Sequence, residues 1–219
     1  MPSPLKVAVI TGGHEYEVIA FHQLFRNLSG IDAYIQHMDE FASSTQAERD
    51  AYDVLVFYSF FQENPTDAGV PWYIGHHQSA LVRLYETSQG IVLLHHAILV
   101  YPKLAMFDEI AGLTNRVIQS YRHDEDVDLH IADHAHPITR GLSDWRMIDE
   151  TYAMDGAGTG NHILITSQHP RNMPTVAWTR TYRKSRVFCF QSGHDHQAYE
   201  NPTFCTVLER GIHWSAGVL

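Results

Sequence analysis

The stretch that decides the fold is Gly90–Ala97, which reads GIVLLHHA. A run of large apolar residues ends abruptly in His95 and His96, and a helix-like segment precedes it. Short apolar runs of this kind are typical of buried parallel strands in α/β proteins. Ligands on such sheets bind beyond the carboxyl ends of the strands, so this is where a site is expected. Because successive strand residues face opposite sides, at most one of the two histidines continues into the core, and the other should face a crevice.

The first half of the chain alternates strand-like and helix-like segments around this stretch. Strands are predicted over residues 6–11, 32–38 and 53–60, and helices over 16–28, 45–51 and 76–87. Thr45 and Glu48 have the spacing of a capping box at the start of the second helix. This alternation predicts a doubly wound parallel sheet with right-handed crossovers.

The second half of the chain has a less regular pattern. Strands are predicted over residues 126–132, 162–167, 175–179 and 186–190, a helix over 202–216, and short helices or loops over 98–114. No internal repeat, low-complexity tract or linker interrupts the chain. We therefore expect a single domain over residues 1–219.

Composition restricts the classes of partner. The chain has 219 residues and a formal net charge of −10, which is poorly suited to binding a phosphate backbone, so nucleic acid is not an expected partner. No apolar run is long enough to cross a bilayer, and Met1–Lys6 lacks a signal-peptide layout. We expect a cytoplasmic protein without a membrane partner, and a homodimer is compatible with this class.

The two cysteines are not arranged as a metal-binding pair. Cys189 and Cys205 form no CxxC pair, which excludes a zinc ribbon.

Three of the predicted strands end in histidine. The segments are GGH at residues 12–14, LHH at 94–96 and SGHDH at 192–196. In a parallel sheet these ends meet at one edge, so we predict that their imidazoles surround a common cavity. Each segment alone is also compatible with a solvated turn or a satisfied core histidine, but all three being so is less expected, because each follows a buried strand in the same sense. The candidate catalytic residues are His95, His96, His194, Glu150 and Asp195.

Three kinds of chemistry fit these residues. A neutral imidazole of His194 or His96 could move a proton, with Glu150 orienting it from an otherwise apolar and aromatic setting. Alternatively, His14, His96 and His194 could hold a divalent metal such as zinc. A serine or cysteine nucleophile is the weakest hypothesis, because the turn that would form a nucleophile elbow holds His95 and His96.

Some residues could bind an anion or a small-molecule carbohydrate. Gly12 and Gly13 allow a close backbone approach at a predicted helix N-terminus, where free N–H groups bind anions or sugar hydroxyls. His14, Tyr152 and Trp178 complete the candidate ligand-binding set. Further aromatic side chains that could stack on a sugar ring are Trp72, Tyr73, Tyr101 and Tyr182.

Over nearly its whole length the chain resembles the ThuA-like trehalose-utilisation family, within the class I glutamine amidotransferase-like superfamily. The resemblance rests on GGH at 12–14, LHHA at 94–97, HPITRGL at 136–142, DETY at 149–152, VAWTRTY at 176–182, RVFCFQSGHD at 186–195 and RGIHWSAG at 210–217. Residues 101–114 match weakly, since only IAGL at 110–113 is similar to the glycine-rich stretch of the family.

The resemblance implies a flavodoxin-like three-layer α/β/α sandwich with a mostly parallel sheet, and a role in the metabolism of disaccharides or their keto derivatives. Amidotransferases of this superfamily carry a cysteine at the elbow, where this chain has His95-His96-Ala97, so thiol-dependent glutamine hydrolysis is not expected. His194 falls where the downstream histidine of the superfamily would lie. We favour an enzyme that uses histidine and carboxylate acid–base chemistry, and the alternative is a non-catalytic sugar-binding or regulatory protein.

Overall fold

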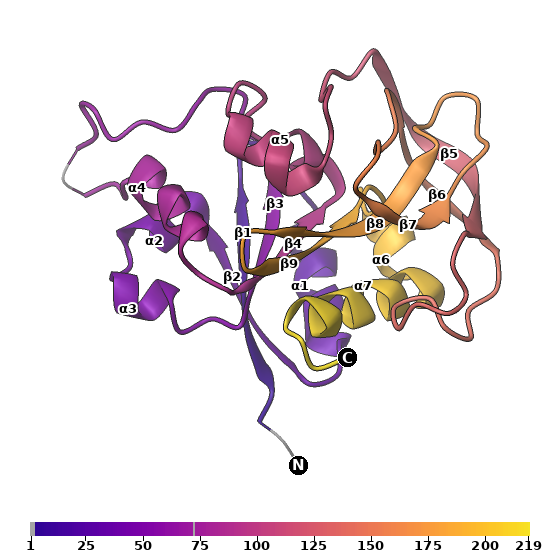
Figure 1. Cartoon of the computed structure of the whole chain (residues 1–219), viewed down its shortest axis with the longest axis horizontal. Coiled ribbons are helices and arrows are strands. Elements are labelled where there is room, and N and C mark those ends of the chain that lie inside the picture. Colours follow the sequence, from indigo (N-terminus) through magenta and orange to yellow (C-terminus); the bar gives the residue numbers. More distant parts are fainter. Residues whose placement is uncertain (1–2, 72) are drawn as a thin grey trace.

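A computed structural model describes residues 3–71 and 73–219, so that Trp72 lies outside the described residues. Its strands form one sheet in the order β2-β1-β3-β4-β9-β8-β7-β5-β6 (Figure 1). The strands are β1 (Leu5–Gly12), β2 (Ile31–His37), β3 (Val54–Ser59), β4 (Gly90–Leu94), β5 (Ser120–Ile131), β6 (Trp145–Ala153), β7 (His162–Thr166), β8 (Thr175–Tyr182) and β9 (Ser185–Phe190). The α-helices are α1 (Val18–Asn27), α2 (Met38–Ser43), α3 (Gln46–Arg49), α4 (His77–Val82), α5 (Ala105–Ala111), α6 (His196–Tyr199) and α7 (Pro202–Ser215), and the 3₁₀ helices are η1 (Arg83–Tyr85) and η2 (His95–Leu99).

Five strands form a parallel half of the sheet. β2, β1, β3, β4 and β9 are joined by parallel ladders throughout. The inner strands β3 and β4 are buried along their whole length, as their near-continuous apolar sequences require. Because the strands are parallel, the segments that follow β1, β4 and β9 leave the sheet at the same edge. This half of the sheet confirms the convergence that the three histidine-ended strands predict.

The prediction of a mostly parallel sheet is wrong. Every ladder beyond β9 is antiparallel: β9 with β8, β8 with β7, β7 with β5, and β5 with β6. β8 and β9 are joined by the two-residue turn Arg183-Lys184, and Arg183 has a φ of 53°. A connection this short joins only antiparallel neighbours, because a parallel pair needs a long crossover. The fold is therefore a mixed α/β fold built on one large sheet.

Helices cover both faces of the sheet, because alternate strand residues point to opposite sides. On one face Ile10 and Leu93 pack in the same hydrophobic cluster as residues of α2, α4 and α5. On the other face Val9 and Leu94 pack with residues of α1, α6 and α7 (Figure 1). This packing fixes the parallel strands, and with them the positions of the turns at their carboxyl ends.

The structure confirms the capping box predicted in the first half of the chain, whereas the start of one strand in the second half differs from the prediction. The capping box is confirmed, since Thr45 Oγ1 accepts a hydrogen bond from the Glu48 amide and Glu48 accepts one from the Thr45 amide. β5 begins at Ser120, well before the predicted residue 126. Among the described residues, no helix combines the length and the apolar character that a bilayer crossing requires.

The contact between α7 and β9 provides a stability prediction. A Cβ built on Gly211 would lie 2.2 Å from ring carbons of Phe188, which is fully buried. We expect Gly211→Ala to lower the free energy of unfolding by about 1–3 kcal/mol through overpacking, although alanine has the better helix propensity. Urea denaturation measures the change. Gly158→Ala is the control, because its Cβ would meet nothing within 4 Å; equal effects of the two substitutions would contradict the prediction.

Candidate functional site

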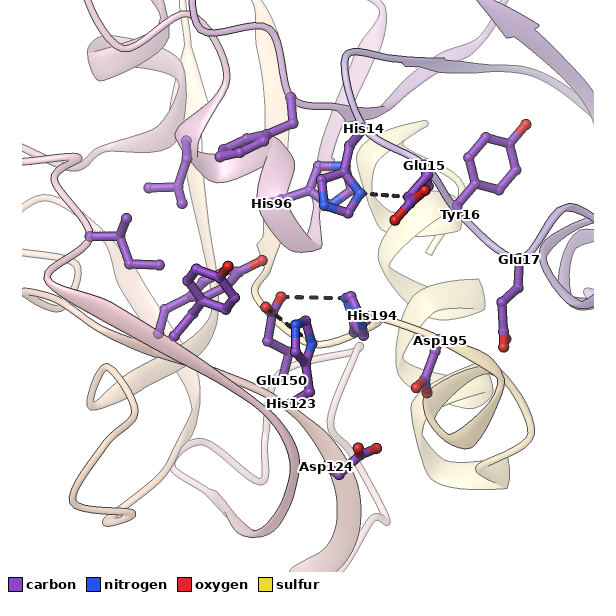
Figure 2. A pocket seen from close by; sticks show the side chains of 15 residues that line it. His14, Glu15, Tyr16, Glu17, His96, His123, Asp124, Glu150, His194 and Asp195 are labelled. Carbon is purple, nitrogen blue, oxygen red and sulfur yellow. Dashed lines mark hydrogen bonds and ion pairs between the residues drawn. The ribbon is translucent and has the colours of Figure 1, made fainter.

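A cavity of about 760 Å³ lies where the carboxyl-end turns of the parallel strands meet the β5–β6 ribbon (Figure 2). We call it the histidine cavity. Its lining consists of His14, Glu15, Tyr16, Glu17, Phe60, His96, Leu99, Ile118, Tyr121, His123, Asp124, Glu150, Tyr152, His194 and Asp195. The volume lies within the range of roughly 300–1,000 Å³ that small-molecule sites occupy. Strand ends far apart in the sequence thus share one hollow.

The turn after β4 has the backbone geometry of an elbow. His95 directly follows the strand, has a φ of 56° and begins η2. Residues other than glycine rarely adopt this left-handed conformation, and it is associated with functional sites. Enzymes with a nucleophile elbow place serine or cysteine on a strained strand-to-helix turn of this kind. Here the turn carries the His95 imidazole, which is fully buried, while His96 forms part of the cavity wall.

His95 is the centre of a hydrogen-bonded group beneath the cavity. Its Nδ1 donates to the backbone carbonyl of Gln191 at 2.8 Å. Its Nε2 lies 2.8 Å from the Tyr152 hydroxyl, 3.0 Å from Glu150 Oε2 and 3.3 Å from His194 Nδ1. His194 Nδ1 lies 3.4 Å from the same Glu150 oxygen. We call His95, Glu150 and His194 the floor cluster; each offers one ligand atom, and these atoms lie within 4.8 Å of one another.

Glu150 reaches the floor cluster because β6 runs beside the turn that follows β9. Asp149 is buried, and its carboxylate accepts hydrogen bonds from the backbone N–H groups of Glu150, Gly193 and His194 at 2.9–3.0 Å. The Gln191 side chain donates to the Glu150 carbonyl at 3.0 Å. These bonds tie the two segments together and fix the positions of both cluster side chains. Sequence reasoning singled out Glu150 but not Asp149, the residue that positions it.

The charges of the floor cluster follow from burial and from the contacts within it. Burial raises the pKa of Glu150, but the hydrogen bond and charge of His95 and the charge of His194 outweigh it, so that the pKa falls below its usual value. Burial, followed by the charge of His95, lowers the pKa of His194. Burial raises the pKa of Tyr152 far above its usual range, with Glu150 adding to the shift. At neutral pH the cavity floor therefore presents a carboxylate, a phenol and a neutral imidazole at His194.

His96 and His14 form a second imidazole pair on the cavity wall. Their ring centroids lie 4.8 Å apart, and His96 also packs 4.5 Å from the ring of Tyr58. Neither ring nitrogen of His96 has a hydrogen-bond partner among the described residues. Burial, together with the charges of neighbouring histidines, lowers the pKa of His96 well below its usual value. Among the described residues, neither histidine of this pair forms a hydrogen bond or ion pair with Glu150, so the pair is not part of the floor cluster.

Some of the candidate residues lie away from the floor cluster. Gly12 and Gly13 line a neighbouring hollow, which meets the histidine cavity only at His14 and Tyr16. Asp195 lines the histidine cavity, but its carboxylate caps α6 by accepting the amide of Gln197. Trp178 is fully buried in the core, where its indole donates to the Ala111 carbonyl. The expectation that Trp178 contacts a ligand does not agree with this position.

The group with metal-ligating geometry differs from the predicted one. His14, His96 and His194 line one cavity, as predicted, but the side chains with metal-ligating geometry are His95, Glu150 and His194, so the predicted metal ligands share only His194 with this group. Side-chain direction explains the difference, since the elbow turns His95 rather than His96 toward Glu150.

His123 of β5 is a cavity residue that sequence reasoning missed. Its Nδ1 lies 3.4 Å from Glu150 Oε1, and its ring packs against that of His194 with the centroids 4.6 Å apart (Figure 2). It sits in an exposed, charged part of β5, where the register with β6 shifts between Arg122 and Glu125. No strand-end pattern marks this segment, and the large number of histidines in the chain was the sole signal available.

Solved structures share this fold. A ThuA-like protein from Parabacteroides merdae is 21% identical, with 98% of this chain and 90% of that chain covered and a TM-score of 0.71. A ThuA-like protein from Bacteroides uniformis is 15% identical, with coverage of 98% and 93% and a TM-score of 0.73. A cytoplasmic protein from Salmonella typhimurium LT2 is 13% identical, with coverage of 96% and 99% and a TM-score of 0.70. At these identities the likeness concerns the fold.

The sequence comparisons decide the family. No curated protein matches the chain. The family model of ThuA, described as trehalose utilisation, matches residues 6–215, which include β1 except for its first residue, the elbow, the floor cluster and all of α7. This match confirms the resemblance drawn from the sequence motifs: the chain belongs to the ThuA family of trehalose utilisation.

Proposed function

We propose that this protein is an enzyme of carbohydrate metabolism that moves a proton on a sugar or keto-sugar bound in the histidine cavity. Family membership supports the carbohydrate part of the proposal. The observation that carries the acid–base part is the floor cluster, in which a carboxylate lies 3.0 Å and 3.4 Å from two imidazole nitrogens. We place the reaction in the cytoplasm, as the name of the Salmonella neighbour gives for that protein.

His194 is the proton-transfer group in this proposal. It lines the cavity, and its lowered pKa leaves a neutral imidazole that can accept a proton near neutral pH. Glu150 holds the ring by its contact with Nδ1 and stabilises the imidazolium that forms. A carbon-bound hydrogen beside the carbonyl of a keto-sugar is the kind of proton such a base removes, because the carbonyl oxygen takes up the negative charge.

The cavity walls suit a polyhydroxylated ligand. Tyr16, Phe60 and Tyr121 line the cavity and offer flat apolar faces for stacking on a sugar ring. Glu15 and Asp124 line the same space and can accept hydrogen bonds from hydroxyl groups. Such a mixture of apolar faces and a few polar groups is typical of small-molecule sites.

The cysteines support the expectation that glutamine is not hydrolysed by a thiol. Burial raises the pKa of Cys189, which is fully buried, and burial also raises the pKa of Cys205. A thiol with a raised pKa is a poor nucleophile. Neither cysteine lines the histidine cavity, and the elbow that carries the nucleophile in amidotransferases holds His95 here.

The same elbow favours a second candidate function, that of a sugar-binding or regulatory protein. If an amidotransferase-like scaffold lost its catalytic activity, it would keep the strained turn and lack the nucleophile. The turn at His95 has this combination. A pure binding protein does not need a carboxylate between imidazoles, however, and for this reason we favour the enzyme.

The test is turnover by His194→Ala and Glu150→Gln on a panel of disaccharides and keto-sugars. We expect each substitution to lower the rate at least ~100-fold, since general acid–base catalysis contributes about that much or more. His130→Ala is the control, because His130 also pairs with a carboxylate, that of Asp144 at 3.0 Å, but lies outside the cavity. Unchanged turnover in both variants would refute the proposal, and thermal stabilisation by a sugar without product formation would favour the binding protein.

A further inference from the structure

The three ligand atoms of the floor cluster form a nearly regular triangle beneath the histidine cavity. His95 Nε2 and Glu150 Oε2 are 3.0 Å apart, His95 Nε2 and His194 Nδ1 are 3.3 Å apart, and His194 Nδ1 and Glu150 Oε2 are 3.4 Å apart. We propose that this triangle binds one divalent transition-metal ion of the zinc class. The inference rests on the proposed function and changes one role in it. With its Nδ1 bound to the ion, His194 is a ligand, and the proton acceptor would be a hydroxide held at the open position of the ion.

The tautomer of His95 argues for a positive charge at this point. A backbone carbonyl can only accept a hydrogen bond, so the 2.8 Å contact with Gln191 places the proton of a neutral His95 on Nδ1. The Nε2 lone pair then faces the carboxylate oxygen of Glu150 at 3.0 Å, which brings two acceptors together. A contact of this kind is stable when a cation lies between the two atoms. A carbonyl that holds the far nitrogen of an imidazole is also the usual support of a metal-binding histidine.

The Tyr152 hydroxyl does not remove the need for a cation between His95 Nε2 and Glu150. Its hydroxyl lies 2.8 Å from His95 Nε2 and can donate one hydrogen bond there. One proton on this hydroxyl cannot also serve the contact between Nε2 and Glu150. Protons on both His95 Nε2 and His194 Nδ1 would serve these contacts, but both protons would then be directed at one oxygen, Glu150 Oε2. A metal ion accepts a lone pair from all three atoms.

The size of the triangle matches the proposed ion. Zinc–nitrogen bonds of about 2.0–2.1 Å at tetrahedral angles place ligand atoms roughly 3.3–3.4 Å apart, close to the three separations in the floor cluster. Two imidazoles and one carboxylate favour zinc and its neighbours over magnesium or calcium, which prefer oxygen ligands. Three protein ligands with an open fourth position are typical of catalytic rather than structural zinc sites.

The open position faces the histidine cavity. Glu150 and His194 line the cavity, and Figure 2 shows the two side chains directed toward each other across its floor. His95 lies beneath them and outside the lining, so it closes the site from behind. The fourth ligand would therefore come from the cavity, as a water molecule or as a carbonyl or hydroxyl oxygen of a keto-sugar. An ion there would polarise that oxygen and assist proton removal beside it.

The test is titration of the untagged, chelator-treated full chain with Zn²⁺, followed by calorimetry and elemental analysis. We expect one equivalent per chain. His95→Ala, His194→Ala and Glu150→Gln should each weaken binding by at least ~100-fold, since even residues that only support a ligand contribute about 10–100-fold. His194→Ala and Glu150→Gln alter side chains that line the cavity, and circular dichroism confirms that each variant is folded. Co²⁺ should show the visible absorption of a tetrahedral site in the unmodified chain and lose it in these variants.

Two matched controls locate the ion. Tyr152→Phe removes a hydroxyl beside His95 but no proposed ligand, and His14→Ala removes an imidazole from the same cavity, so both should retain one equivalent of Zn²⁺. Absence of zinc binding in the unmodified chain, or loss of zinc in His14→Ala with retention in His95→Ala, would overturn the inference. If the unmodified chain binds no zinc but turns over keto-sugars, the ion is refuted and the proposed function stands. Stoichiometric zinc without turnover of any sugar would support the ion and count against the proposed function.

Discussion

Trp178→Ala is expected to lower the free energy of unfolding by about 3–5 kcal/mol, a large share of the stability of a typical domain. The side chain is fully buried in the middle of the sheet, on β8, and packs in the same cluster as Cys189 and the residues of α5. Its indole N–H donates to the Ala111 carbonyl at 2.8 Å, at the end of α5. Truncation would leave a large cavity and would remove the indole donor from the buried Ala111 carbonyl, which would keep the weak 3.8 Å contact with the Cys189 thiol. Urea denaturation, analysed for the midpoint and the slope, measures the loss.

Trp178→Phe separates the two contributions and tests the role of this residue. Phenylalanine keeps most of the apolar volume and loses the hydrogen bond to Ala111, so we expect a smaller loss, of about 1–3 kcal/mol. Because Trp178 lies outside the histidine cavity, the affinity of the folded variant for a sugar should not change. Weaker sugar binding by Trp178→Phe with unchanged stability would restore the ligand-binding role that the sequence indicated.

Strand direction limits how much of this fold could be predicted from the sequence. In the parallel half, apolar runs such as those of β3 and β4 alternate with amphipathic helices, and this alternation has few topological solutions. In the other half, β7 and β8 are short strands with similar apolar content, and nothing in their composition states their direction. The usable signal was the spacing, because the two residues Arg183 and Lys184 between β8 and β9 leave no room for a crossover.

The site could be predicted to the extent that it depends on the parallel strands. His14, His96 and His194 line one cavity because β1, β4 and β9 end at the same edge. The partners of these residues come from β5 and β6, which form an antiparallel ribbon, and the sequence does not encode where that ribbon meets the edge. His123 was missed for this reason. Which histidine of the elbow contacts Glu150 also depended on a single φ angle, that of His95.

Asp149→Ala is expected to lower the free energy of unfolding by about 3–5 kcal/mol and to abolish the arrangement of the floor cluster. The substitution would leave three buried backbone N–H groups, those of Glu150, Gly193 and His194, without an acceptor. Each unsatisfied group costs about 1–3 kcal/mol, and relaxation of the turn recovers part of the sum. Urea denaturation gives the stability, and hydrogen exchange at the Gly193 and His194 amides reports the turn itself.

Asp149→Asn distinguishes the hydrogen bonds of this carboxylate from its charge. Burial raises the pKa of Asp149 against the opposing effects of His95 and the backbone N–H groups, so the charge itself is costly in the folded state. Asparagine removes that charge and keeps one acceptor oxygen, which can still serve the two amides bound by Oδ1, those of Glu150 and His194. We therefore expect Asp149→Asn to lose clearly less stability than Asp149→Ala, with the increase in exchange rate confined to the Gly193 amide. Equal losses in the two variants would mean that the charge, rather than the pattern of acceptors, holds β6 against the turn after β9.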